Sequence, residues 1–240
     1  MHAGMPMTSL SATDRRMADR PGEASAAQPA SSLSELAYRR LEEAIVTLSL
    51  RPGAVLTEAQ LIALVGVGRT PVREALIRLA QQGMVEILPR KGVVVAGINA
   101  IDIMSALDAR EVLERLIASD AARRASPAER IGIVDKARAM RMAAETGDTN
   151  AYMRLDKEFD ALVGEAARSP YAVRAVEPLQ ALIRRAWYHF ERQDDLLPAA
   201  ARHAAFAQAL GTADPQAAMA ASDTLMQHLR SGLLATLTRD

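Results

Sequence analysis

The chain has 240 residues, half of them apolar, and its 29 basic and 29 acidic side chains give a formal net charge of zero. Such a composition suits one large or two smaller globular domains and excludes a uniformly basic nucleic-acid coat, but it allows a small DNA-reading face on a neutral body. The absence of cysteine excludes disulfides and thiolate metal sites. No apolar run approaches the roughly 20 residues of a membrane span. The N-terminus also lacks the order of a secretory signal, so we expect a cytoplasmic protein that does not contact a membrane.

The N-terminal segment is predicted to be a disordered tail. Residues 1–32 are rich in Ser, Ala, Gly, Pro and Met and show no periodicity. Helical periodicity begins near Ser34, and Pro52 with Gly53 ends this first helix. The Thr-x-x-Gln pattern that begins at Thr57 has the form of a capping box and predicts the start of a second, short helix.

A third helix is predicted after the turn between Gly66 and Gly68, with Thr70 as its N-cap and Pro71 as its first helical residue. Apolar residues then recur at i, i+3, i+4 and i+7 and form one buried stripe, which leaves Arg69 and Arg73 exposed. A short helix of this kind, placed one turn after another, is typical of the recognition helix of a helix-turn-helix. Taken alone, this stretch also fits an ordinary helical hairpin.

Two short β-branched runs follow the third helix. They comprise residues 84–88 and 93–95 and flank a Pro-Arg-Lys-Gly turn. This pattern predicts a hairpin with Arg90 and Lys91 at its tip, and with Gly92 permitting the turn. Three helices followed by such a hairpin form a winged helix-turn-helix, which we assign to residues 33–98.

Residues 99–240 carry no further strand signal and contain a series of helix starts. They lie at Asn99, at Ser126 in a second capping box, near Asp148 or Asn150, at Ser169, near Pro198 and at Asp214. We therefore predict an all-α antiparallel helical bundle in this region. The fold class is mainly α, with an N-terminal winged helix-turn-helix followed by this bundle.

Two parts of the sequence resemble known families. The Arg-Thr-Pro-Val-Arg-Glu-Ala-Leu run at 69–76, with the Pro-Arg-Lys-Gly-Val run at 89–93, closely resembles the DNA-binding domain of GntR-type bacterial transcription regulators. Gly68 departs from the serine that is usual in that family, and Ala80 departs from a usual glutamate. The helical remainder resembles the FCD effector domain of the FadR branch. That match rests on Arg110 with Glu114, on the segment from Asp156 to Asp160, and on His203 and His228.

The candidate DNA-reading residues are Arg69, Thr70, Arg73, Arg90, Lys91 and Gly92. Arginine can fork onto guanine O6 and N7 in the major groove, and each such contact gives roughly 1–3 kcal/mol of discrimination. Thr70 lies at a helix N-terminus, where its hydroxyl and free N–H groups suit a phosphate. The alternatives are an ion pair between Arg73 and a neighbouring glutamate, and a solvated turn at Arg90 and Lys91.

A candidate metal site lies in the bundle. Asp156 and Asp160 are four residues apart at the edge of one apolar stripe, while His203 and His228 lie on apolar faces of later helices. These four side chains from three helices could enclose a divalent cation, with open positions for water or a ligand carboxylate. Spacing alone favours the alternative, in which each histidine is a hydrogen-bonded residue of the core or its rim. The resemblance implies metal binding, with zinc as the first expectation. Manganese or nickel stays open, because the family usually has histidine where this chain has Asp160.

Arg110 is the candidate effector-binding residue. It interrupts an apolar stripe together with Glu114, which indicates either an internal salt bridge or part of a polar pocket. In the family that the chain resembles, an arginine here can reach an effector carboxylate. Arg184, Arg185, Trp187 and Tyr188 could add a basic, aromatic wall, or could be a solvated face with a core tryptophan.

The leading hypothesis is a ligand-responsive transcription regulator, expected to be a repressor. As a homodimer it would bind a short inverted-repeat operator in double-stranded DNA, with a small organic acid bound near the metal as effector. A metal-dependent hydrolase is a second hypothesis, although the sequence offers no well-placed base or nucleophile for it. A third is an architectural DNA-binding protein without an effector. We expect no enzymatic activity.

Overall fold

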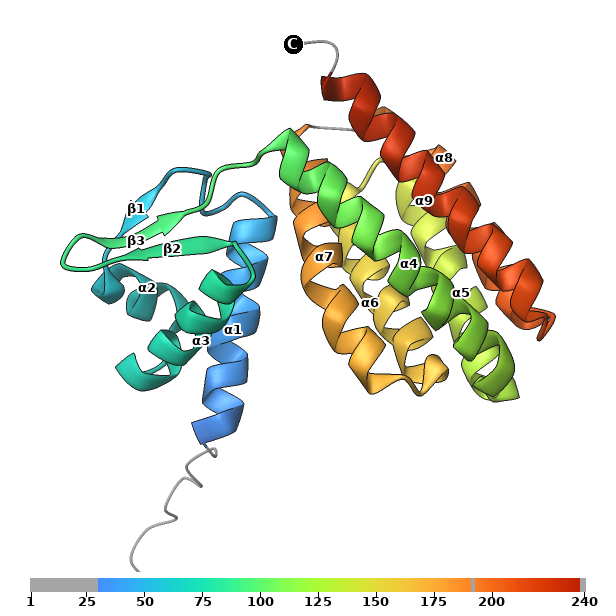
Figure 1. Cartoon of the computed structure of the whole chain (residues 1–240), viewed down its shortest axis with the longest axis horizontal. Coiled ribbons are helices and arrows are strands. Elements are labelled where there is room, and N and C mark those ends of the chain that lie inside the picture. Colours follow the sequence, from blue (N-terminus) through green and yellow to red (C-terminus); the bar gives the residue numbers. More distant parts are fainter. Residues whose placement is uncertain (1–29, 191–192, 238–240) are drawn as a thin grey trace, which may run out of the picture.

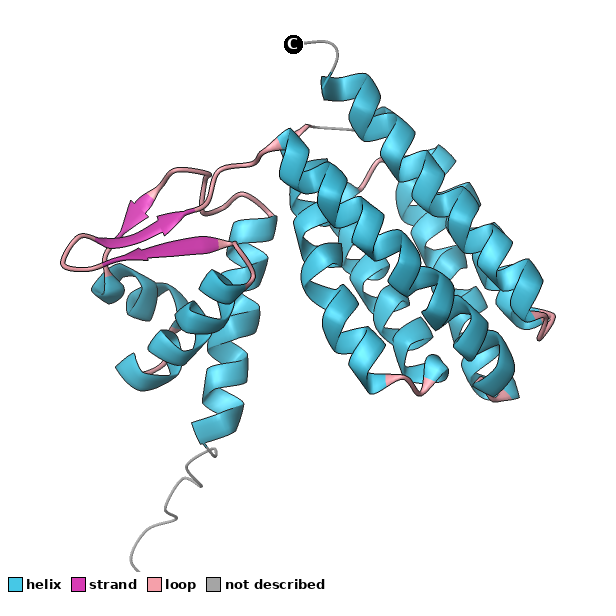
Figure 2. Cartoon of the chain, in the orientation of Figure 1, coloured by secondary structure: helices cyan, strands magenta, loops and turns pink. Residues whose placement is uncertain are grey.

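The computed structural model describes residues 30–190 and 193–237, which form two parts that lie side by side (Figure 1). Figure 2 shows helices throughout the second part, whereas the first combines helices with a small sheet. The elements of the first part are α1 (Ala30–Val46), β1 (Val55–Leu56), α2 (Glu58–Val65), α3 (Arg69–Gln81), β2 (Val85–Leu88) and β3 (Gly92–Val95). Most of the predicted disordered tail lies outside the described residues, and its last three residues, 30–32, belong to α1.

The two helices of the helix-turn-helix are fixed by local capping. Thr57 accepts a hydrogen bond from the backbone N–H of Gln60, whose side chain accepts one from the N–H of Thr57, so the predicted capping box is confirmed. Gly66 ends α2 in the left-handed region. The predicted N-cap of α3 was wrong. Gly68 takes that place with an extended backbone, and Thr70 is the second residue of the helix, because the chain already enters the helix at Arg69.

The predicted hairpin is confirmed, and it belongs to a three-stranded sheet. β2 and β3 pair antiparallel with Val85 opposite Val95 and Leu88 opposite Gly92. β1 adds to the other edge of β3, with Val55 opposite Val94. This strand was not predicted, since two residues carry no alternation and its partner lies almost 40 positions away.

The second part consists of long helices whose starts match the predicted capping signals. Asn99 caps the first, Ser126 forms a capping box with Glu129, and Asp148 caps the next. Proline follows Ser169 at the start of a further helix. The elements are α4 (Ala100–Arg124), α5 (Pro127–Glu145), α6 (Thr149–Ala167), α7 (Pro170–His189), the short 3₁₀ helix η1 (Gln193–Asp195), α8 (Leu196–Gly211) and α9 (Pro215–Leu237).

Helix α4 organises the bundle. It packs against α6, α7 and α9, while α5 packs against α6 and α8 on the far side. Its buried face carries the charged residues Arg110 and Glu114 among apolar ones. The first part has a hydrophobic core of its own between α1, α3 and the sheet. Ala181 of α7 also packs into this core. None of the helices in the described ranges is long and apolar enough to cross a membrane.

Candidate DNA-binding surface and buried polar cluster

The start of α3 presents two exposed arginines. The side chains of Arg69 and Arg73 are 70% and 60% exposed. Val72 and Leu76 are buried on the opposite side, as the periodicity predicts. Both guanidinium groups pair with the carboxylate of Glu58, at 2.9 Å from Arg69 Nε and 3.0 Å from Arg73 Nε. The two arginines are thereby held together at one end of the helix.

The ion pairs with Glu58 do not prevent these arginines from binding DNA. An exposed ion pair contributes only about 0.2–1 kcal/mol, whereas a forked arginine–guanine contact is worth roughly 1–3 kcal/mol. DNA can therefore displace the carboxylate. Sequence reasoning anticipated a glutamate partner for Arg73 without identifying it, because Glu58 lies on α2 and reaches both arginines only through the tertiary fold.

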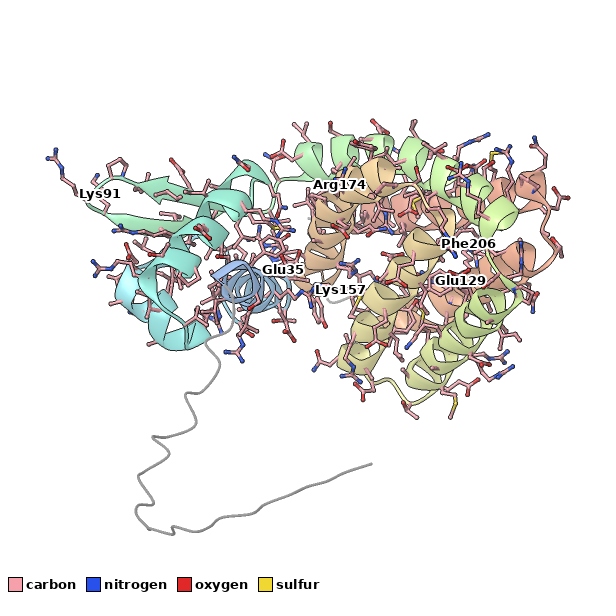
Figure 3. All side chains as sticks on the ribbon, turned by 90° about the horizontal axis from the view of Figure 1, so that it is seen from below. Glu35, Lys91, Glu129, Lys157, Arg174 and Phe206 are labelled. Atoms are coloured by element: carbon pink, nitrogen blue, oxygen red, sulfur yellow. The ribbon has the colours of Figure 1, made fainter. Side chains whose placement is uncertain are left out.

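The wing carries its basic residues at the tip of the hairpin. Figure 3 shows Lys91 at this tip, far from the helical bundle. Arg90 and Lys91 are exposed, as is Thr70 in the first turn of α3. Gly92 has a φ of +109°, and a Cβ atom there would lie 2.5 Å from the carbonyl oxygen of Leu56. The predicted DNA-reading residues therefore lie on exposed turns and helix ends of the first part, and their contact with DNA stays a prediction.

A cluster of charged side chains is buried in the bundle between α4, α6, α7 and α8. Arg184 is its centre: its Nε donates to Asp156 at 2.8 Å and its Nη2 donates to Asp160 at 3.0 Å. Arg110 donates to Glu114 at 2.9 Å and also lies 3.6 Å from Asp160. Of the two alternatives for Arg110, the internal salt bridge with Glu114 is present. Arg184 and Arg185 are both buried, so the solvated-face alternative for them was wrong.

His203 joins this buried cluster through Asp156. Its Nε2 lies 3.2 Å from an oxygen of Asp156, and its Nδ1 lies 2.9 Å from the carbonyl oxygen of Ala199. Both ring nitrogens therefore face groups that accept hydrogen bonds. Burial disfavours the charged imidazole, but the hydrogen bond and charge of Asp156 outweigh burial, and the pKa of His203 is raised above its usual value.

The two aspartates have opposite pKa shifts. Burial by itself would raise the pKa of Asp156, but the hydrogen bond with His203 and the charge of Arg184 bring it below its ordinary value. Burial and the neighbouring Asp156 charge raise the pKa of Asp160 to about 6, despite the opposing charge of Arg110. The pKa values of two close carboxyl groups move apart because ionising both would place two negative charges next to each other.

The four predicted metal ligands do not come together. Asp156, Asp160 and His203 lie in the buried cluster, but His228 on α9 pairs with Asp195 at 2.9 Å. No group of three histidine, aspartate or glutamate side chains within residues 30–190 and 193–237 is arranged to hold a metal ion. The physical reason is that Arg184 already binds one oxygen of each aspartate, while His228 pairs with Asp195. These residues do not fit the predicted metal.

A small cavity lies beside the cluster. Its volume is about 30 Å³, which is room for a water molecule or two and far below the roughly 300–1,000 Å³ of a ligand pocket. A ligand can enter only if the surrounding side chains rearrange. The cavity is lined by Arg110, Tyr152, Met153, Asp156, Ile183, Arg184, Trp187, Ala199, His203 and Leu229.

Helix α7 connects the buried cluster with the first part of the chain. Arg184 points into the cluster, while its neighbour Arg185 is fully buried and donates to the carbonyl oxygen of Ala96, just after β3. No described residue provides a hydrogen-bond partner for Nε or Nη1 of Arg185. A second link is an ion pair between Lys157 of α6 and Glu42 of α1. Figure 3 shows Lys157 on the side of the bundle that faces α1.

Comparison with known families matches both parts of the chain. Residues 33–95 match the family described as bacterial regulatory proteins, gntR family. Residues 105–230, which are more than half of the chain, match the FCD domain. The first match covers α3 and the wing, and the second covers all helices that contribute to the buried cluster.

Similar proteins are named as transcription regulators. The HTH-type transcriptional repressor RspR of Escherichia coli strain K12 is 28% identical over 160 residues, which cover 67% of this chain and 70% of RspR. An HTH-type regulator from an unstable DNA locus of Streptomyces ambofaciens is 44% identical over 77 residues, 32% of this chain and only 33% of that protein.

Solved structures share the fold. E. coli McbR/YncC superposes with a TM-score of 0.77 at 19% identity, over 85% of this chain and 98% of that one. A GntR regulator from Rhodococcus sp. RHA1 has a TM-score of 0.64 at 22% identity, with the same coverage. The solved structures thus share the fold of this chain, and the two family models together match both of its parts. The chain belongs to the gntR family of bacterial transcription regulators and carries an FCD domain.

Proposed function

We propose that this regulator is a repressor that binds an inverted-repeat operator as a homodimer and releases it in response to a small organic acid. The DNA-binding half of the proposal is carried by the exposed pair Arg69 and Arg73 at the start of α3, together with the exposed basic residues at the tip of the wing. Repression is supported by the name of the RspR relative. The effector half is supported by the buried arginines of the FCD domain.

Dimer formation is supported by one face of α4. Ile101, Val112 and Leu116 lie within a narrow arc of this helix and are 78%, 69% and 49% exposed. A row of exposed apolar side chains on one helix suits a two-fold contact, in which the same face serves both subunits. Two recognition helices related by such an axis would read the two halves of an inverted repeat.

The route from the ligand to DNA is supported by α7. Arg184 contacts the buried cluster and Arg185 contacts the backbone that follows the wing, so one helix contacts both the cluster and the DNA-binding domain. Because the cavity is small, a ligand has to shift the side chains around Arg184. The ligand then favours the arrangement of α7 that accommodates it, which biases the position of the DNA-binding domain.

The DNA-binding proposal is tested with Arg73→Ala. An operator is first selected from a random double-stranded library with the wild-type chain, and affinity for it is compared with that for scrambled DNA at one salt concentration. Loss of the contact should reduce this ratio by roughly tenfold or more in each half-site, following about 1–3 kcal/mol per contact. Arg138→Ala, on the exposed surface of α5, is the control. An unchanged ratio for Arg73→Ala would contradict the proposal.

The effector proposal is tested by screening small organic acids, with their neutral amides as controls, for thermal stabilisation. A specific ligand at 100 times its Kd should add about 2.7 kcal/mol to stability. The same compound should then weaken operator binding. An acid that stabilises the protein without changing DNA affinity would favour the architectural alternative, and turnover of the compound would favour an enzyme.

A further inference from the structure

The position that a metal ion would take in the buried cluster is filled by a side chain. The guanidinium of Arg184 lies between Asp156 and Asp160 and donates to one oxygen of each. Its side chain is only 9% exposed, so solvent does not compete for these bonds. The second cation, Arg110, lies 3.6 Å from the oxygen of Asp160 that Arg184 already binds.

Asp156 and His203 make further contacts that use their other polar atoms. The second oxygen of Asp156 faces His203 Nε2, and the other ring nitrogen of His203 faces the carbonyl of Ala199. A metal needs ligand lone pairs that are free and aimed at one point. Here the aspartate lone pairs are directed at guanidinium donors, and both imidazole nitrogens face acceptors.

The charges around the cluster also disfavour a divalent cation. A divalent cation between the two aspartates would lie next to Arg184 and Arg110, both buried, where charge–charge repulsion is screened far less than in water. The cluster already balances most of its charge, since two guanidinium groups and the His203 imidazole face three carboxylates, including Glu114. Burying a further double charge would therefore be costly.

We infer that Arg184 takes the place of a metal ion in this FCD domain, so that the pocket is built and works without metal. The inference concerns the pocket of the proposed function but needs neither its ligand nor its operator. The positive charge of the site is then the guanidinium of Arg184, and chelators should not alter the structure of the pocket.

The test uses the full chain, purified without an affinity tag or chelator. Metal content is measured by inductively coupled plasma mass spectrometry, and unfolding temperature is measured with EDTA and with Zn²⁺, Ni²⁺ or Mn²⁺. The wild-type chain should carry only traces of metal, and its Tm should not shift in either condition. A wild-type chain that carries about one ion per chain and loses Tm in EDTA, as a structural metal site would, overturns the inference whatever the variants do.

Arg184→Gln tests whether the guanidinium is what excludes metal. This variant leaves the carboxylates uncompensated, so it should have a lower Tm and should regain part of it with Zn²⁺. Arg115→Gln, which removes an exposed ion pair with Asp223, is the control and should gain nothing from Zn²⁺. If Arg184→Gln does not fold, the Asp160→Asn, Arg184→Gln double variant restores the charge balance, and Zn²⁺ should stabilise it more than the wild type. Failure of the folded variant to respond to metal would refute the role given to Arg184.

Discussion

At the scale of single residues, two glycines with positive φ have very different surroundings. Gly83 and Gly92 both have positive φ, at +71° and +109°. Around Gly83 there is open space, whereas Gly92 faces the carbonyl of Leu56 in β1 at a distance that excludes a Cβ atom. The glycine of the wing is therefore needed for the sheet as well as for the turn.

We predict that Gly92→Ala destabilises the first part far more than Gly83→Ala. Both changes incur the cost of a left-handed conformation, about 1–3 kcal/mol, but only Gly92→Ala also forces β1 away from β3. The free energy of unfolding, measured by urea titration and circular dichroism, gives the comparison. Equal losses for the two variants would mean that β1 does not lie against Gly92.

At the scale of elements, the helices are positioned by caps and by a few buried polar links. The start of α5 is an example. Glu129 accepts hydrogen bonds from the backbone N–H and the hydroxyl of Ser126, and it pairs with Arg168 at 2.7 Å. These contacts favour the ionised carboxylate, and they lower the pKa of Glu129 to about 2.

The capping contacts of Glu129 predict a pH-dependent stability. Because its folded-state pKa lies below the ordinary 4.5, the contribution is present above that value and is lost as pH falls toward 2. Glu129→Gln should therefore lower Tm at pH 7, and the difference from wild type should shrink between pH 5 and pH 3. Glu145→Gln, which removes an exposed pair with Arg141, serves as the control. A difference that does not depend on pH would contradict this role for the charge.

Helix α7 carries a second prediction at this scale. Arg185 is fully buried, and among the described residues it donates only to Ala96, so replacing it by methionine keeps its packing and removes a poorly compensated charge. We expect Arg185→Met to be as stable as wild type or more so. The link between the effector site and the wing should nevertheless weaken, which reduces the effect of ligand on DNA affinity.

This expectation is checked by measuring operator affinity with and without the stabilising acid. Coupling free energies of this kind are typically about 1–3 kcal/mol, so losing the link should remove a several-fold change in affinity. Arg174→Met, on the exposed side of the same helix, is the matched control. If the acid changes the operator affinity of Arg185→Met as much as that of the wild type, Arg185 does not carry the coupling between the ligand site and DNA.

At the scale of the whole molecule, the arrangement in Figure 1 places the DNA-reading residues and the buried cluster in different parts of the chain. Contacts between the two parts include the hydrogen bond from Arg185 of α7 to the segment after β3 and the ion pair between α6 and α1. The exposed face of α4 lies outside both sites. A dimer built on that face would leave the recognition helix and the wing free for DNA.

We predict that Val112→Asp converts the dimer to a monomer at micromolar concentration. A two-fold axis near this residue would bring two introduced carboxylates into one apolar contact, where their repulsion and desolvation oppose association. Light scattering after size exclusion measures the mass. Ile131→Asp changes an exposed residue of α5 and should remain dimeric. The opposite pattern would move the interface to α5.

Much of this molecule could be predicted from local sequence. Capping boxes at Thr57 and Ser126, and a proline after Ser169, predicted where helices begin, because caps act through contacts within one turn. The apolar stripe opposite Arg69 and Arg73 predicted which face of α3 is exposed. Motif resemblance led to the family that the comparisons confirm.

The tertiary structure alone decided which charged groups meet. Glu58 joins Arg69 and Arg73 from another helix, Asp195 pairs with His228, and Arg184 enters between Asp156 and Asp160. Periodicity indicates that a side chain is buried, but it does not identify its partner, because these partners lie 11 to 33 residues apart on different helices. The short strand β1 and the fit of Gly92 against Leu56 depend on such distant contacts for the same reason.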